Sequence, residues 1–287
     1  MTEVISRPSQ ATENDGAKRA EPRKSRSLGL MGYRAAFLVT FVLVWWLLHR
    51  FVLPDVLPSV EGTLTEMVGL LTGSEFYEQM WLTVRRVVGG FAIAYIGAMT
   101  LGTLMGRSKR AEAFFEIFIV AGLSQPGIFI AMIILVALGL KESSAIIAIG
   151  FLAIPIVTVN FWQGTKNLDS SLEQMAQVFG YSGVQKLRHV ILPQLLSPAM
   201  ASVRHGFGIA WKYVVVIELL GLPNGVGYNV NRAFQLFDLQ AVIAWTLGFM
   251  FFVASFEYVV LRPLERSLFA WRDRPTGKLA ADHAATA

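Results

Sequence analysis

Six apolar runs constrain the fold of this 287-residue chain more than any other feature, because each is long enough to cross a lipid bilayer. A bilayer core of roughly 30 Å needs about 20 mostly apolar residues per helix. Charged residues make up only 16% of the chain, which is less than a soluble domain of this length carries. The sequence therefore predicts an all-α membrane protein with six transmembrane helices, near 33–53, 84–106, 114–138, 144–163, 198–221 and 239–261.

The distribution of Lys and Arg predicts how these helices are oriented. The first 30 residues are basic, and so are the loop 107–110 and the segment after Leu261, whereas the segment 54–78 has no Lys or Arg. Since cytoplasmic loops carry an excess of Lys and Arg, we expect both termini and the segment 164–197 in the cytoplasm. The chain is then a multi-pass protein of the cell inner (plasma) membrane, with lipid around its helices.

The same pattern predicts three parts. Residues 1–30 are polar and lack the apolar patterning of a core, which is typical of a disordered tail, here basic and cytoplasmic. A single transmembrane domain follows over 31–265. Residues 266–287 form a cytoplasmic C-terminal tail.

The sequence lacks the residues that several classes of active site require. The chain has no cysteine, which excludes thiol catalysis and thiolate metal sites, and its four histidines show no metal-ligand spacing. It also has no phosphate-binding Gly-Lys-Ser/Thr loop. We therefore expect no cofactor and no catalysis. Cytoplasmic sidedness accounts for the basic residues, so we expect no nucleic-acid partner.

A stripe of small residues in the second apolar run predicts close helix packing. Small residues recur at every fourth position, at Gly90, Ala94, Ala98, Gly102 and Gly106. In lipid, helices associate through van der Waals fit, which small residues permit by letting two backbones approach. Packing within the chain is favoured over a subunit interface.

The third apolar run contains a break signal. Pro126 removes a backbone donor and Gly127 loosens the helix, so we expect a kink there. Gln125 lies beside the kink near the middle of the run. It is a candidate for the lining of a translocation path, and ordinary packing is an equally good interpretation.

Polar and charged residues in and near the fifth run are costly in free energy to place inside a bilayer. Lys212 lies near the middle of the membrane, where a charge must meet water or a partner, so it either lines a path or pairs with a neighbouring helix, for example through Glu257. Glu218 lies near the outer end, as a gate or as an ordinary helix-end carboxylate. Arg85 and Arg86, at the outer end of the second run, are expected to snorkel to the interface.

A polar, helix-prone segment separates the fourth and fifth runs. Asp169 or Ser170 can cap a helix over 171–179, which Gly180 ends. Ser182 can cap a second short helix that runs to about His189 and ends before Leu192-Pro193. One face of this pair carries Leu172, Met175, Ala176 and Phe179. The pair could dock into a soluble partner or lie on the lipid headgroups, and periodicity alone leaves both open.

The segment Asp169–Pro193 resembles the cytoplasmic loop signature of binding-protein-dependent ABC importer permeases. That signature reads Glu-Ala-Ala, three residues, Gly, nine residues, Ile, one residue, Leu-Pro. The spacing from Gly180 to Leu192-Pro193 agrees with it. Counting back from Gly180, Gln174 stands at the family glutamate, and Met175 and Ala176 stand at the two alanines. Glu173 comes one residue earlier.

Two further segments are similar to the nitrate, sulfonate and taurine branch of this family. One is Thr83-Val-Arg-Arg-Val-Val-Gly-Gly90. The other contains Glu218-Leu-Leu-Gly and Gly225-Val-Gly-Tyr228. With the loop signature, the resemblance covers most of residues 80–265.

The resemblance implies the permease subunit of an ATP-driven importer. Such permeases form a homodimer around one path, bind cytoplasmic ATP-binding subunits and receive solute from an external substrate-binding protein. The branch implies a small organic anion such as a sulfonate or taurine, or nitrate. An ion-coupled secondary transporter using Lys212 is the alternative. The implied ATPase-coupling residues are Glu173, Gln174, Met175, Ala176, Gly180, Leu192 and Pro193.

Overall fold

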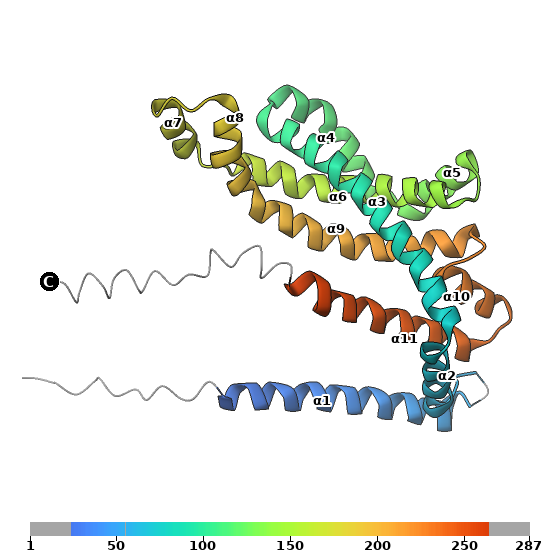
Figure 1. Ribbon diagram of the computed structural model, residues 1–287. Helices are drawn as coiled ribbons and strands as arrows, with labels where there is room; N and C mark the ends of the chain where they lie inside the picture. The colour runs from blue at the N-terminus through green and yellow to red at the C-terminus, as the bar shows by residue number, and fades with distance from the viewer. Residues whose placement is uncertain (1–23, 55, 264–287) are drawn as a thin grey trace, which may run out of the picture. The chain divides into compact units, whose positions relative to one another are not determined.

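The computed structural model describes residues 24–54 and 56–263, with side chains from residue 32 onward. Within these residues every regular element is a helix, which confirms the all-α prediction (Figure 1). The chain divides into two compact units, 1–60 and 61–287, which are treated separately below. Most of the predicted N-terminal tail and all of the predicted C-terminal tail lie outside the described residues. The three-part division stays a prediction.

The first unit contains one long helix. Helix α1 (Lys24–Leu47) continues into the π-helical stretch η1 (Leu48–Val52). After η1 the chain turns back on itself: the Trp45 indole donates to the Pro58 carbonyl at 3.1 Å, and the His49 ring nitrogen Nδ1 lies 2.6 Å from the Leu57 carbonyl.

The second unit is a bundle of helices of very different lengths. Its elements are α2 (Val60–Thr72), α3 (Ser74–Arg107), α4 (Lys109–Ser124), α5 (Gly127–Leu138), α6 (Glu142–Lys166), α7 (Ser170–Val178), α8 (Gly183–Lys186), η2 (Leu187–Ile191), α9 (Leu192–Gly221), α10 (Val226–Gln235), α11 (Leu239–Phe256) and η3 (Glu257–Leu261). The short helices α7 and α8 lie at one end, beyond α6 and α9, and α10 lies at the opposite end with α2 and α5 (Figure 1).

The candidate membrane spans agree with the predicted apolar runs in place. Four helical stretches are long and apolar enough to cross a bilayer by themselves: Gly32–Val52, Ser74–Arg107, Glu142–Lys166 and Leu239–Leu261. Two bent pairs bring the number to six if each pair counts as one span: α4 with α5, bent by 101°, and Gly183–Gly221 with α10, bent by 48°. The predicted kink after Gln125 is therefore confirmed in position, but the chain turns there far more sharply than a kinked helix does. The six-span count stays a prediction.

The stripe of small residues packs α3 against α6. A Cβ atom added at Gly90 would lie 2.5 Å from Cβ of Ile149, and one added at Gly102 would lie 2.5 Å from Cβ of Phe161. Ala94 and Ala98, between them in the stripe, are fully buried. The prediction of packing within the chain is confirmed.

Helix α9 lies at the centre of the second unit. Its buried face, with Trp211 and Val214, joins the main apolar core with residues of α3, α5 and α6. The Trp211 ring meets Phe249 and Phe252 of α11 edge to face, with ring centroids 5.8 and 6.2 Å apart. Helix α9 is therefore in contact with α3, α5, α6 and α11.

The predicted end of the second short helix is wrong. The chain stays helical from Gly183 through η2 and on to Gly221, so that Leu192 and Pro193 begin α9 rather than follow a finished helix. Pro193 lies in the first turn of α9, directly after the π-helical stretch, where Leu192 donates its amide to the Leu187 carbonyl. Proline is tolerated in a first turn because the amide that it lacks has little to bond there.

Candidate functional site

Helices α7 and α8 form a projecting pair whose local structure the sequence dictates. Asp169 caps α7 and accepts hydrogen bonds from the Ser171 amide at 2.8 Å and the Ser171 hydroxyl at 2.5 Å. The Ser171 hydroxyl, followed by the backbone amide, holds the pKa of Asp169 below its ordinary value. Gly180 ends α7 at φ 71°, a left-handed conformation that glycine adopts without strain. Ser182 and Gln185 form a reciprocal capping box at α8. The predicted caps are thus confirmed.

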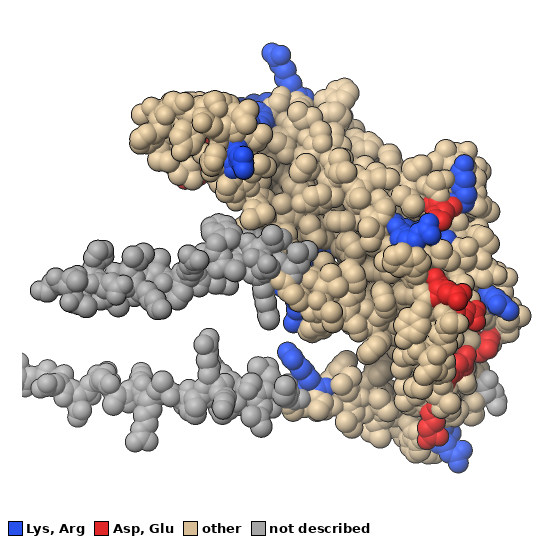
Figure 2. Space-filling view, viewed as in Figure 1, with Lys and Arg blue, Asp and Glu red and all other residues tan. Residues whose placement is uncertain are grey.

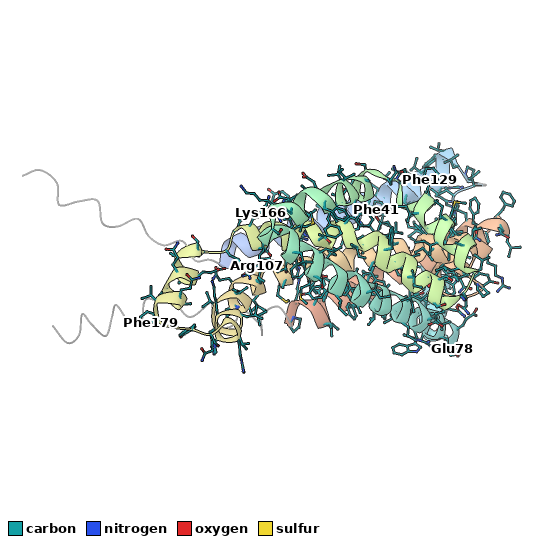
Figure 3. All side chains as sticks on the ribbon, turned by 90° about the horizontal axis from the view of Figure 1, so that it is seen from above. Phe41, Glu78, Arg107, Phe129, Lys166 and Phe179 are labelled. Atoms are coloured by element: carbon teal, nitrogen blue, oxygen red, sulfur yellow. The ribbon has the colours of Figure 1, made fainter. Side chains whose placement is uncertain are left out.

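The outward surface of the pair exposes large apolar side chains among polar ones such as Gln174 and Gln177. Val178 is 85% exposed, Val184 75% and Phe179 72%. Figure 3 places Phe179 at the far end of the molecule, beyond Arg107 and Lys166 and opposite Glu78 and Phe129. Apolar side chains this exposed at the end of a helical bundle indicate a surface that another molecule covers.

The predicted coupling residues divide into an outer and an inner set. Gln174 and Met175 are exposed on the outer surface of α7. Ala176 is 2% exposed and faces inward, so it packs inside the pair and offers no contact to a partner. Leu192 and Pro193 are exposed at the start of α9.

Glu173 belongs to the inner set because it is engaged within the chain. Its carboxylate lies 2.9 Å from the Lys186 amine of α8 and 3.4 Å from the Arg107 guanidinium at the end of α3. The first contact joins the two short helices, and the second ties the pair to the transmembrane body. Glu173 therefore positions the pair, while its neighbours Gln174 and Met175 face outward.

Glu218, at the other end of α9, lies in a buried ion pair that the sequence did not reveal. Its carboxylate accepts a hydrogen bond from the Arg86 guanidinium of α3 at 2.6 Å, and the two side chains are 0% and 2% exposed. Thr83 donates its hydroxyl to the same carboxylate at 2.9 Å, and the Gly227 amide donates at 2.9 Å. Each charge in this apolar region is thereby paired and hydrogen-bonded, as a buried charge requires.

The same network fixes the turn between α9 and α10. Arg86 donates to the Asn224 backbone carbonyl at 3.0 Å and also to its side-chain oxygen. The Gln79 side chain accepts from the Gly225 amide at 2.6 Å. The expectation that Arg86 snorkels to the interface is therefore wrong, because Arg86 has a buried partner. Arg85, beside it, pairs at the surface with Glu142 at 2.9 Å.

A sequence signal for this network existed. Gln79, Thr83 and Arg86 are spaced four and three residues apart, which places them on one face of a helix. The segments around Thr83 and Glu218 both carry the resemblance to the importer family. What sequence reasoning missed is that these two segments contact each other.

Lys212 is exposed on α9. Among the described residues, no hydrogen bond or ion pair joins it to another side chain, and Glu257, the partner considered for it, instead accepts two hydrogen bonds from Arg204, the shorter at 2.9 Å. The structure therefore does not support the Lys212–Glu257 pair.

Gln125 lies at the sharp break between α4 and α5. It lines a small pocket of about 150 Å³ with Phe118, Phe151 and Pro155. Within the described part of the chain, no hydrogen bond joins Gln125, Lys212 and Glu218 to one another, so the three predicted path residues occupy separate places.

Charged side chains are sparse between the two ends. In the view of Figure 2, acidic side chains gather at the end opposite α7 and α8, and most of the remaining visible surface carries no charge. A belt without charge is what lipid contact requires.

Comparison with known proteins agrees with these features. The chain is 28% identical over 222 residues to the aliphatic sulfonates transport permease protein SsuC of Bacillus subtilis, covering 77% of this chain and 80% of that protein. It is 23% identical over 241 residues to the taurine transport system permease protein TauC of Escherichia coli, covering 82% and 87%. A similar match, 23% over 239 residues covering 83% and 95%, is the formylaminopyrimidine transport permease protein ThiX of Halalkalibacterium halodurans.

The family of binding-protein-dependent transport system inner membrane components matches residues 98–263, which include α7, α8 and all of α9. This range extends over more than half of the chain. The protein is therefore a membrane-embedded transport component of the ABC importer class, and it belongs to the family of binding-protein-dependent inner membrane permeases.

Proposed function

We propose that this chain is the permease subunit of an ATP-driven importer whose ATPase is a separate cytoplasmic protein that binds the α7–α8 pair. The observation that carries the proposal is the apolar outward surface of that pair, formed by Met175, Val178, Phe179 and Val184. Membership of the importer family supports this function over an ion-coupled carrier that would use Lys212.

The mechanism follows from how the pair is attached. The helix that begins at α8 continues without a break into α9, and Glu173 connects α7 to α3 through Arg107. A displacement of the pair is therefore passed to both helices. ATP binding would favour one arrangement of two ATPase subunits and hence one arrangement of the bundle, because a ligand shifts an equilibrium toward the state that it binds more tightly.

Two copies of the chain, related by a two-fold axis, would enclose one path for the solute. The α7–α8 end would face the cytoplasm, and the end with α10 would face an external substrate-binding protein. The basic loop 107–110, near the α7–α8 end, and the segment 54–78, which has no Lys or Arg, support this orientation; Figure 2 shows acidic side chains gathered at the α10 end, with some Lys and Arg beside them.

For the solute we propose a small organic anion such as a sulfonate or taurine, or nitrate. The relatives named for aliphatic sulfonates and taurine support this class. The relative named for formylaminopyrimidine shows that permeases of similar sequence are named for different solutes.

Co-purification in detergent with candidate ATPase subunits tests the proposal. We expect the wild-type chain to retain an ATPase, whereas a chain with Val178→Asp and Phe179→Asp, or with residues 172–190 deleted, does not. Gln177→Asp adds one charge to the same helix, roughly 100° round from Val178 and about 160° from Phe179, and leaves both apolar side chains in place, so it should retain the ATPase. Equal recovery with all variants would contradict the proposed docking surface.

A single cysteine tests the orientation, because the chain has no cysteine of its own. We expect Ser59→Cys in intact cells to react with a membrane-impermeant thiol reagent added outside. Reaction only after the cells are permeabilised would reverse the orientation.

A further inference from the structure

The two charged residues in the second half of α9, Lys212 and Glu218, lie in opposite surroundings. Glu218 is buried and paired with Arg86, whereas the Lys212 side chain is exposed. At about 1.5 Å per residue, Lys212 lies roughly 13 Å along the helix from Gly221, at the end of α9. Exposure of a lysine to lipid at such depth costs several kcal/mol, and snorkelling relieves that cost only near helix ends. Lys212 therefore faces water or a polar partner.

The face of α9 around Lys212 differs from the faces that suit lipid. The exposed side chains of α5 are large and apolar: Ile128, Phe129, Met132, Ile133 and Val136. Between Ala201 and Lys212 the exposed positions of α9 are small or polar, namely Ala201, Arg204, His205 and Gly208, whereas nearer its two ends α9 exposes Leu192 and Leu219. A helix whose exposed face is small and polar at membrane depth is typical of one that lines a polar cavity.

Gly208 makes space directly beside Lys212. A Cβ atom added at Gly208 would meet nothing within 4 Å. Residues four apart on a helix share a face, with Cβ atoms roughly 5–6 Å apart. A small solute can therefore approach the α9 backbone at Gly208 and remain within reach of the Lys212 amine.

The net charge of this face is positive. Glu218, the single carboxylate of α9, is turned inward and neutralised by Arg86. Arg204 is paired with Glu257, which leaves Lys212 as the residue on this face for which no carboxylate partner lies among the described residues. The arrangement attracts anions and repels cations.

We infer that Lys212, with the open position Gly208, is an anion-binding point of the translocation path. This inference rests on the proposed function, in which two copies of the chain enclose one path, and it adds that α9 of each copy faces that path. Two lysines that face each other repel, so an anion or water must lie between them. The ligand class is a small solute with one oxyanion group, such as a sulfonate, a carboxylate or nitrate.

Charged thiol reagents test this site without knowledge of the natural solute. Gly208→Cys would be the single cysteine of the chain, reconstituted with its ATPase in lipid vesicles. The probes are the anionic sulfonatoethyl and the cationic trimethylammonioethyl methanethiosulfonates. In each case the cysteine thiolate attacks the reagent sulfur, a disulfide forms and methanesulfinate leaves. The measured quantity is the ratio of the anionic to the cationic reaction rate.

We expect Lys212→Met to lower this ratio about tenfold, because Coulomb's law gives a factor of about three for unit charges roughly 6 Å apart in bulk water, and loss of the charge slows the anionic reagent and speeds the cationic one. Lys212→Glu should lower it further. Ile133→Cys on the apolar face of α5 is the matched control and should react with neither reagent. An unreactive Gly208→Cys, or a ratio that does not change with residue 212, would overturn the inference.

The proposed function has a separate readout in the same samples. Lys212 lies far along α9 from the α7–α8 pair. ATPase recovery should therefore be equal for the Gly208→Cys chain with Lys, Met or Glu at position 212. A missing ATPase counts against the proposed function, whereas an unchanged rate ratio counts against the anion-binding point alone.

Discussion

Glu173 and Glu218 both pair with an arginine of α3, but at opposite ends of that helix and in opposite surroundings. Glu173 lies 3.4 Å from Arg107, and the two side chains are 27% and 46% exposed. Glu218 lies 2.6 Å from Arg86, and both side chains are buried. Exposed apolar side chains occur near both carboxylates: Val178 and Phe179 near Glu173, and Phe234 and Phe237 in and directly after α10.

This difference shows which end of the second unit is fixed by a buried ion pair. At the α10 end, the buried network pairs Arg86 with Glu218 and fixes the turn between α9 and α10 onto α3, although the Arg86 Nε has no hydrogen-bond partner among the described residues. At the α7–α8 end, solvent weakens the ion pairs, and an apolar surface remains uncovered. Both ends expose apolar side chains that a partner could cover, and the buried ion pair is what distinguishes the α10 end.

The largest expected effect comes from breaking the buried pair. Glu218→Gln leaves Arg86 charged and without its carboxylate, which costs about 3–5 kcal/mol. For a chain of this size we expect the unfolding midpoint in detergent to fall by roughly 10 °C or more. Arg85→Met, which removes only the exposed pair with Glu142, is the control and should shift the midpoint by about 2 °C or less. Equal shifts for the two variants would mean that the buried Arg86–Glu218 pair contributes no more to stability than the exposed Arg85–Glu142 pair, which would contradict this account.

A smaller loss is expected where α3 packs on α6. A Cβ atom at Gly102 would lie 2.5 Å from Phe161 and 2.8 Å from the Thr158 carbonyl, so Gly102→Ala must push the two helices apart. Overpacking of this kind costs about 1–3 kcal/mol. At Gly97 on the same helix, the nearest atom to an added Cβ is Cδ1 of Ile154, at 3.4 Å. Thermal unfolding of both variants checks this, and a Gly97→Ala variant that unfolds earlier than Gly102→Ala would contradict the packing described here.

The smallest effect is expected at Glu173. Glu173→Gln removes two surface ion pairs, each worth about 1 kcal/mol or less, so the unfolding midpoint should change little. Because Glu173 faces inward, ATPase co-purification should persist. Met175→Asp on the exposed surface should instead reduce it. Loss of the ATPase with Glu173→Gln but not with Met175→Asp would show that the carboxylate itself contacts the partner.

Local features of this fold could be read from the sequence, because each depends on neighbouring residues. Asp169, Gly180 and Ser182 begin and end the short helices as their side chains and backbone conformations dictate. The apolar runs predicted where in the sequence the long helices lie. The small-residue stripe predicted close packing of α3 within the chain, but not that α6 is the helix it packs against.

Features that depend on tertiary contacts could not be read in the same way. Arg86 and Glu218 are 132 positions apart, and nothing local specifies their contact. Pro126 marks the place of the break between α4 and α5, but packing sets its 101° angle. Helix α9 extends back through Pro193 because the π-helical stretch before it continues the helix, which a proline by itself argues against.

Site-specific photocrosslinking tests the contrast between the two ends most directly. A benzophenone amino acid would replace Phe179 at one end or Tyr77 at the other, each exposed by more than half, in cells that also express the candidate ATPase. We expect light to join the ATPase to the chain with the probe at position 179 and not at position 77. A crosslink from position 77, or none from position 179 in cells where the ATPase co-purifies, would contradict the assignment of the α7–α8 pair as the surface that binds the ATPase.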